Sequence, residues 1–361
     1  MRKIHADFEC GNIRVLREED GDIYLQNELR GTTRDYFYWA FCVEGAQGQT
    51  LSFHLDKEWV GPFGAAISHD LIHWQWMDSR SDGFSFTYHF GEEEDRVYFA
   101  HDLVYTPTRL RAVLGELGLT PKTLCLTPKG REVPCLTVGS GSRPIVLASR
   151  HHACESPGSY VLEGVLRAYL ADPIPDTFLF VVPFADYDGV FDGDQGKGRA
   201  PFDHNRDYTD APIYPEVREI IRFAGENPVY MGFDFHAPGH SGGSRCGKIF
   251  VVRKFAEKEP LFDTFGQLFE AACGEDAVKY FVSGDIHPNV GWNKDTTPTF
   301  STFFNTLEGC RFACTLENTF FGTAENKVTA EKLVNTGRAF CRAVRQFAAQ
   351  CDHPPKKDDP S

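Results

Sequence analysis

The sequence contains no long apolar run. Its longest, residues 178–184, is far shorter than the roughly 20 residues that a membrane-spanning helix requires. Residues 1–16 also lack the apolar core and the small-residue cleavage site of a signal peptide. We therefore expect a cytoplasmic protein with no membrane as partner.

Runs of basic residues are missing as well, apart from Lys356 and Lys357 near the end of the chain. The formal net charge is −14 at pH 7, and residues 1–110 alone carry 19 acidic against 10 basic side chains. Such a surface repels a nucleic acid duplex or an anionic membrane. We therefore expect no nucleic acid partner.

The eleven cysteines include no CxxC pair. In a long chain without secretion features, this usage predicts buried thiols and no disulfide framework. Cys310 and Cys314 are four residues apart, but their surroundings indicate a strand, so we do not interpret them as a metal-binding pair.

Aromatic residues are plentiful up to about residue 105, where four of the five tryptophans lie. Short apolar or alternating segments, separated by Gly and Asp, are typical of strands in an all-β sandwich. The segments are 36–44, 50–56, 73–78, 84–90 and 96–102. We predict a smaller N-terminal β-sandwich domain over residues 1–105.

From residue 106 onward, predicted strands alternate with predicted helices. Strands are expected at 143–149, 177–184, 229–235, 248–254 and 311–317, and helices at 108–118, 160–171, 216–225, 261–273 and 329–350. Ser156 and Pro157 are interpreted as the N-cap and first residue of the second helix. This alternation predicts an α/β domain over residues 106–350, with a sheet covered by helices on both faces, followed by a frayed tail at 351–361.

Three predicted strands end in residues that can bind or assist a metal ion. The strand 143–149 leads to His152 and Glu155, the strand 229–235 to His236, and the strand 311–317 ends at Glu317. In open α/β sheets, function is found beyond the carboxyl ends of strands. Two histidines and a glutamate form a ligand set for catalytic zinc that leaves one position open for water.

The order of these motifs resembles the zinc metallocarboxypeptidases, most closely the cytosolic carboxypeptidase branch, whose members carry an N-terminal β-sandwich. The resemblance covers about residues 96–325. Its motifs are VYFAHDLVYTPTRLRAVL at 97–114, SRHHACESPGS with Arg150, VVPFADYDGV at 181–190, DHNRDY at 203–208, DFHA at 234–237 and TLENTFFG at 315–322. It implies a carboxypeptidase-like mixed sheet flanked by helices.

The same resemblance implies the role of each residue. His152, Glu155 and His236 would bind one zinc ion per chain, and Glu317 would be the general base for the metal-activated water. Asn205 and Arg206 would hold the terminal carboxylate of the substrate, Arg206 through a bidentate contact. The implied reaction is hydrolysis of the C-terminal bond of a peptide or protein. Asp234 is either a partner of His236 or a residue that satisfies buried backbone. The oligomeric state stays open.

The chain departs from the family pattern at two positions. Gly196 stands where the family places an arginine that stabilises the oxyanion; Lys197 or Arg199 could replace it, and we favour Lys197. The last tyrosine, Tyr280, is too far from Glu317 to match the family's mobile tyrosine, which leaves Trp292 or no residue for that role. Arg245 or Arg311 could line a pocket for an acidic terminal residue, and the preferred residue stays open.

Several alternatives compete with this interpretation. A frame that pairs His151 with Cys154 is possible, but the His152–Glu155 frame fits the family better. Gly239 to Gly243 reads G-x-S-x-G, yet no strand directly precedes Ser241 and no helix is predicted after it, so a serine esterase is disfavoured. A zinc amidohydrolase of the aspartoacylase or succinylglutamate desuccinylase type shares the metal set. A non-catalytic peptide-binding module would be expected to lack a metal ligand or the general base, and this sequence retains all of them.

Overall fold

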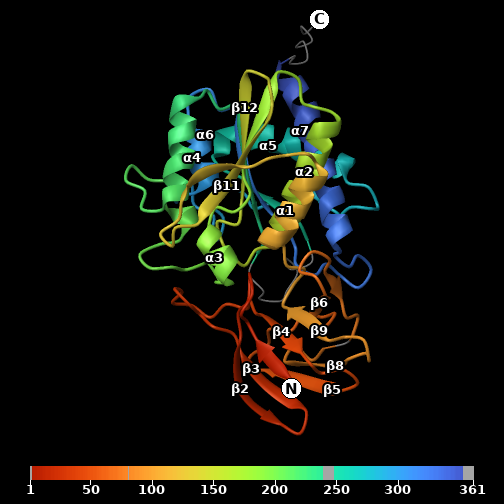
Figure 1. The fold of residues 1–361 in the computed structure, drawn as a ribbon. Coiled ribbons are helices and arrows are strands. Elements are labelled where there is room, and N and C mark those ends of the chain that lie inside the picture. Colours follow the sequence, from red (N-terminus) through yellow and green to blue (C-terminus); the bar gives the residue numbers. More distant parts are fainter. Residues whose placement is uncertain (1, 80, 239–247, 353–361) are drawn as a thin grey trace, which may run out of the picture.

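The computed structural model describes residues 2–79, 81–238 and 248–352 (Figure 1). Its N-terminal part consists of two facing β-sheets. The first has the order β1 (Lys3–His5), β4 (Ala40–Glu44), β9 (Arg96–Ala100), β6 (Ala66–Ser68), β7 (Gln75–Trp76), and the second β2 (Arg14–Glu19), β3 (Asp22–Gln26), β5 (Thr50–Leu55), β8 (Ser85–His89). Phe41, Phe53, Phe86 and Phe99 are fully or nearly fully buried between them. This confirms the predicted sandwich.

Strands β1, β2, β3 and β6 were not anticipated from the sequence. β1 and β6 have only three residues each. β2 reads RVLREE and is largely exposed at the edge of its sheet. Edge strands of this kind carry charge and little apolar alternation, which removes the signal that identifies a strand.

A seven-stranded sheet forms the centre of the remaining chain. Its order is β10 (Lys122–Leu126), β11 (Glu132–Gly139), β13 (Thr177–Val182), β12 (Arg143–Ser149), β14 (Met231–His236), β16 (Phe312–Glu317), β15 (Phe250–Val252). The central pairs β13–β12, β12–β14 and β14–β16 are parallel, whereas β10, β11 and β15 pair antiparallel. The sheet is therefore mixed, as expected; the hairpin β10–β11 was not predicted.

Helices cover both faces of this sheet (Figure 1). Ile145 and Leu147 of β12 share a core with α1 (Pro107–Glu116), α2 (Pro157–Ala171), α5 (Glu259–Ala272) and α7 (Ala330–Asp352). Val146 and Ala148 face the other way, towards α4 (Pro215–Glu226) and α6 (Phe300–Thr306). This alternation of buried side chains on a parallel strand is what two covering layers require. The shorter helical segments are α3 (Tyr187–Asp192), His204–Arg206, Ala256–Lys258 and Val282–Gly284.

Two details of the helix predictions need correction. Pro157 is the first residue of α2, but Ser156 has helical dihedral angles and makes no side-chain capping hydrogen bond, so it does not cap the helix. Helix α7 continues to Asp352, two residues past its predicted end, where Arg143 binds the Asp352 carboxylate at 2.8 Å. Residues 353–361 lie outside the described part of the chain.

The sandwich and the α/β region share one continuous apolar core. Ala100 and Tyr38 from the sandwich belong to the same cluster as Tyr105 and Tyr160, and Trp76 Nε1 donates a hydrogen bond to the Val328 carbonyl at 2.8 Å. The ten described cysteines are free thiols, as predicted; Cys246 is outside the described residues. Within residues 2–79, 81–238 and 248–352, every helix is too short or too polar to serve as a membrane span.

Candidate metal centre and substrate cleft

The predicted metal ligands and the predicted general base meet at one edge of the central sheet because β12, β14 and β16 are adjacent and parallel. His236 and Glu317 end their strands as register partners. His152 and Glu155 follow β12, where Arg150 turns the chain with a φ of 60°. The Arg150 guanidinium is buried and donates to the carbonyls of Tyr105 and Ala153, so it stabilises this loop and does not face a substrate.

His152, Glu155 and His236 form a compact donor cluster whose ligand atoms lie within 4.8 Å of one another. His152 Nδ1 is 2.9 Å from Glu155 Oε1, His236 Nδ1 is 2.7 Å from Glu155 Oε2, and the two Nδ1 atoms are 3.2 Å apart. All three side chains are buried. Two imidazole nitrogens and a carboxylate converging on one point are the donor set that zinc prefers, so the residues fit a zinc ion.

The remaining ring nitrogen of each histidine faces an acid, as metal-binding histidines require. His236 Nε2 lies 2.6 Å from Asp234 Oδ2, and His152 Nε2 lies 3.5 Å from Asp203 Oδ1. Burial alone would raise the pKa of Asp234, but the neighbouring His151 and His236 outweigh it and lower the pKa below its usual range. Such a carboxylate stays ionised and fixes the orientation of the ring.

His151 points away from the cluster. Its Nδ1 is 2.8 Å from Asp234 Oδ1 and its Nε2 is 2.7 Å from the Tyr208 hydroxyl. His151, Asp234 and His236 form a second group of potential ligands, but every one of these contacts is an ordinary hydrogen bond inside the core.

Glu317 and Lys197 flank the donor cluster. Glu317 is buried, and burial raises the pKa of its carboxyl group. Lys197 Nζ is 2.6 Å from Glu155 Oε1. Burial opposes its charge, but Glu155 and Glu317 outweigh it and raise the pKa of Lys197, which keeps the ammonium group protonated.

Arg199 is not available for the same role because its guanidinium binds Asp186 at 2.7 Å and Asp194 at 3.2 Å. Gly196, at the position of the family's arginine, has a φ of 72°, and a Cβ there would lie 2.2 Å from the backbone nitrogen of Ala153. A side chain at residue 196 therefore cannot fit, and Lys197 is the nearby cation that reaches the cluster.

A cleft of about 510 Å³ opens in front of these residues. His152, His236, Glu317, Lys197, Asn205, Arg206 and Trp292 line it, together with Arg34, Lys254 and Lys294. Arg206 donates to the Asn205 carbonyl at 2.8 Å through Nη1. Asn205 donates to Asp234 Oδ2 at 3.2 Å and accepts from the Phe300 backbone at 2.9 Å, so its amide is already engaged.

Sequence reasoning missed Arg34 and Lys254, two charged residues of this cleft. Arg34 belongs to the N-terminal part, and the loop that carries it contacts the catalytic-side loop where Thr33 N donates to the Gly198 carbonyl at 3.4 Å. Lys254 is buried, donates to the Lys294 carbonyl at 2.8 Å, and has its pKa lowered to about 8 by burial. No local sequence pattern marks Arg34 as a residue of the cleft. Asp203, which faces His152, is indicated only by its place in the motif DHNRDY.

Comparisons with known proteins find relatives of this chain in sequence and in fold. The family described as the cytosolic carboxypeptidase N-terminal domain matches residues 4–101. Cytosolic carboxypeptidase 2 of Xenopus tropicalis is 27% identical over 76% of this chain and 31% of its own length, and that of Danio rerio is 27% identical over 97% and 56%. Cytosolic carboxypeptidase 3 of Mus musculus is 30% identical over 74% and 29%.

The chain is homologous to the cytosolic carboxypeptidases. It spans about one third to just over one half of the length of these relatives. The fold is that of a metallo-carboxypeptidase from Burkholderia cenocepacia, with a TM-score of 0.79 and 20% identity over 97% of this chain and all of that one. A metallo-carboxypeptidase from Pseudomonas aeruginosa, solved with (2-guanidinoethylmercapto)succinic acid, has a TM-score of 0.76 at 20% identity over 97% and 99%.

The remaining candidates from the sequence fall elsewhere. Arg311 precedes β16 at the opposite edge of the sheet from Glu317, so it does not line the cleft. Tyr280 is buried and donates to Asp285 at 2.9 Å, which excludes it as a mobile tyrosine. Trp292 is 55% exposed and lines the cleft. Ser241 and Arg245 lie outside the described residues.

Proposed function

We propose that this chain is a zinc-dependent metallocarboxypeptidase that removes the C-terminal residue of a peptide or protein. The observation that carries the proposal is the convergence of His152 Nδ1 and His236 Nδ1 on the Glu155 carboxylate, beside Glu317 and in the same cleft as Arg206. The metal set alone fits several hydrolases, whereas a buried base and an arginine in one cleft fit a free-carboxylate substrate.

When bound, one zinc ion held by His152, Glu155 and His236 acts as a Lewis acid that polarises the scissile carbonyl and makes water more acidic. Glu317 accepts the proton of the attacking water and passes it to the leaving amine. Its raised pKa suits a group that must hold that proton between the two steps. Lys197 carries the fixed positive charge nearest to Glu155 and stabilises the charge that develops on the carbonyl oxygen.

Arg206 binds the terminal carboxylate of the substrate, since its guanidinium lies in the cleft and can present a two-pronged donor. Asn205 stands beside it, and would have to exchange its bond to Asp234 to join this contact. In this proposal residues 106–350 carry out the reaction and residues 1–105 form the accessory sandwich. The enzyme works in the cytosol, the compartment that the names of its relatives give for those proteins.

The decisive comparison uses one peptide with a free carboxyl terminus and the same peptide amidated. Removing one partner of a desolvated charge pair costs about 2–5 kcal/mol, so Arg206→Ala is expected to lower kcat/KM on the free peptide roughly 30-fold or more at about 1.4 kcal/mol per tenfold. The unmodified enzyme should cleave the amidated peptide as slowly as Arg206→Ala cleaves the free peptide, because the amide offers no charge to Arg206.

Arg311→Ala is the matched control, an arginine next to the opposite end of β16 that should change neither rate. Equal rates on both peptides, or internal cleavage of long chains, would contradict the exopeptidase proposal. Fast hydrolysis of N-acylated amino acids with no peptide cleavage would favour the amidohydrolase alternative.

A further inference from the structure

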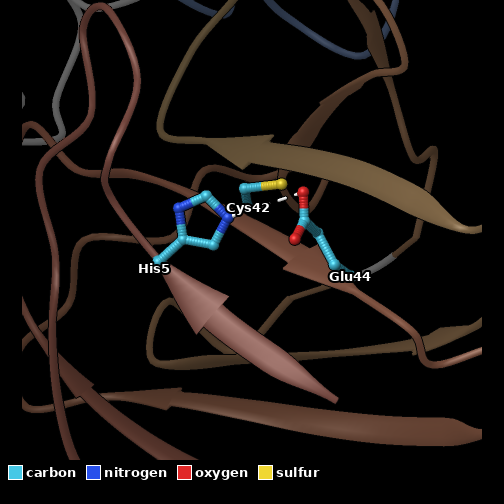
Figure 2. Close-up of side chains that lie close together, drawn as sticks. All are labelled: His5, Cys42 and Glu44. Atoms are coloured by element: carbon cyan, nitrogen blue, oxygen red, sulfur yellow. Dashed lines mark ion pairs between the residues drawn. The ribbon is translucent and has the colours of Figure 1, made fainter. Parts of the chain in front are cut away.

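A second cluster of metal-binding donors lies in the N-terminal sandwich, remote in sequence from the candidate catalytic residues. Strand β1 pairs antiparallel with β4, and the register sets His5 opposite Cys42 and Lys3 opposite Glu44. Directly opposed residues of an antiparallel pair share a face, as do residues two apart on one strand. His5, Cys42 and Glu44 therefore point to the same side of the sheet, and Figure 2 shows their side chains converging.

The spacing of the three donors suits a single ion. One ligand atom from each residue lies within 4.8 Å of the other two. His5 Nε2 is 3.8 Å from Glu44 Oε1, too far for a hydrogen bond. Bonds of about 2.0–2.3 Å in a tetrahedral zinc site separate neighbouring ligand atoms by roughly 3.3–3.8 Å. The 3.8 Å separation of His5 and Glu44 already lies at the upper end of this range, and the distances to the Cys42 sulfur are within 4.8 Å.

The donor atoms themselves have spare capacity. His5 Nε2 is buried and has no hydrogen-bond partner among the described residues. Cys42 is fully buried, so its sulfur is shielded from solvent oxidants. Arg96 Nε donates at 2.8 Å to Glu44 Oε1, the same oxygen that lies 3.8 Å from His5 Nε2, so Glu44 has to turn its carboxylate to offer Oε2 to the ion. A carboxylate bound through one oxygen and hydrogen-bonded through the other is a common metal ligand.

We propose that His5, Cys42 and Glu44 form a second site for a divalent transition metal, zinc above all. Imidazole, thiolate and carboxylate together select zinc or a similar borderline ion over magnesium or calcium, which prefer oxygen ligands alone. The ion displaces the thiol proton of Cys42 to solvent and forms a metal–sulfur bond. Three protein donors leave the fourth tetrahedral position to water.

The residues around His5 can adjust to this role. Asp7 N donates to His5 Nδ1 at 3.1 Å, and Asp7 Oδ2 lies 3.9 Å from the same nitrogen. When Nε2 binds the ion, Nδ1 carries the proton and no longer accepts from Asp7 N; the exposed Asp7 carboxylate can turn to accept the Nδ1 proton instead. Histidine ligands are commonly oriented by such an acid.

The site would fasten an edge strand. β1 has three residues and pairs only with β4, at the end of the five-stranded sheet. A metal ion shared by β1 and β4 adds a cross-link to a ladder of only three residue pairs. Its binding to the folded state alone would stabilise the sandwich by mass action.

Cobalt titration of the full chain, stripped of metal with a chelator, tests this proposal without any measurement of activity. The cluster of His152, Glu155 and His236 offers no sulfur, so Co²⁺ there cannot produce sulfur-to-metal charge-transfer absorption in the near ultraviolet. We expect two Co²⁺ per chain and a charge-transfer band that belongs to one of them. Cys42→Ser should bind one Co²⁺ and lose the band.

His5→Gln supplies an independent variant at the edge strand, and it should also bind one Co²⁺ and lose the band. Cys10→Ser, another buried cysteine of the N-terminal part, is the control that should keep both the band and the second ion. No band in the unmodified protein, a band that survives Cys42→Ser, or one Co²⁺ per chain in all four proteins would overturn the proposal. These outcomes leave the peptidase proposal standing, because that rests on the other cluster.

Discussion

The two halves of the molecule each gather three metal-binding donors, but they do so with different sheet geometry. In the α/β half, parallel strands end at one edge, and loops beyond β12 and β14 bring His152, Glu155 and His236 together. In the sandwich, an antiparallel register places His5 beside Cys42 on a sheet face. The parallel arrangement buries all three donors and leaves a cleft in front of them, whereas in the antiparallel one only Cys42 is buried and His5 and Glu44 are partly exposed.

The surroundings of the donors differ in the same sense. At the strand ends, Asp234 faces His236 Nε2 and Asp203 faces His152 Nε2, the ring nitrogens outside the donor cluster. Glu317 lies beside the same cluster. At the sandwich, the corresponding acid is Asp7, whose side chain is 78% exposed. A buried acid fixes the orientation of the histidine ring that it contacts, whereas an exposed acid does not. The cluster of His152, Glu155 and His236 therefore suits a catalytic ion. The cluster of His5, Cys42 and Glu44 suits a structural ion.

The largest effect should come from the residue that has no counterpart in the sandwich. Glu317→Gln removes the proton acceptor without removing a ligand, so kcat should fall about 100- to 10,000-fold while the bound zinc is retained. Steady-state kinetics and elemental analysis of the same preparation measure both quantities. Glu331→Gln, on the exposed start of α7, should leave kcat unchanged. Loss of zinc from Glu317→Gln would make this residue a ligand.

The boundary between the two halves contains a buried acid whose effect should be nearly as large. Asp102 follows β9, is fully buried, and neither of its carboxylate oxygens has a hydrogen-bond partner in the described structure. Burial raises its pKa from 3.8 to about 7, although the charge of Arg150 opposes the shift.

Because the folded state keeps that proton to higher pH than the unfolded state, the free energy of unfolding should fall as pH rises from about 4 to 7, by roughly 4 kcal/mol at 1.4 kcal/mol per unit. Asp102→Asn should be more stable than the unmodified protein at pH 8 and similar at pH 4. Urea denaturation at both pH values tests this, with exposed Asp210→Asn as control. Parallel curves for the two proteins would be inconsistent with a neutral Asp102.

The difference between buried and exposed acids gives a third test. Asp234→Asn weakens the acceptor of His236 Nε2, and loss of such a partner lowers metal affinity about 10- to 100-fold. Asp7→Asn at the sandwich should change the affinity of the second site far less, since Asp7 lies 3.9 Å from His5. Competition with a calibrated chelator measures both. Equal losses of metal affinity in Asp234→Asn and Asp7→Asn would contradict the claim that a buried acid supports its metal site more than an exposed one.

The smallest effect should come from the residue that the sandwich side contributes to the cleft. Arg34 is exposed, and exposed ion pairs contribute about 0.2–1 kcal/mol. Arg34→Ala should therefore raise KM for an anionic peptide by no more than about five-fold and leave kcat unchanged, with the increase disappearing at high salt. Arg14→Ala, which lies on β2 away from the cleft, is the control. A kcat effect would make Arg34 more than a binding residue.

Much of this arrangement could be predicted from sequence, because parallel strands that are buried on both faces read as apolar runs. The strand 143–149 was predicted with the bounds of β12, and His236 and Glu317 fall at the ends of β14 and β16. These predictions depend on local patterns of apolar residues and on the residues at strand ends, both of which can be read directly from the sequence.

What could not be predicted depends on tertiary contacts. The sequence favoured Lys197 over Arg199, but the ion pairs of Arg199 with Asp186 and Asp194, which exclude it, form only in the folded chain. Arg34 enters the cleft through contact between two loops, and His5 meets Cys42 only through the register of a three-residue strand. Tyr280 was rejected as the mobile tyrosine on its spacing from Glu317, and the hydrogen bond from its hydroxyl to Asp285 is a second reason that the sequence does not show.

Anomalous diffraction at the zinc edge from crystals of the zinc-loaded chain tests the central claim most directly. The account predicts a peak bonded to His152 Nδ1, His236 Nδ1 and the Glu155 carboxylate, with the cleft on its open side. No peak there, or a peak on the opposite side of the His236 ring between His151 and Asp234, would contradict it.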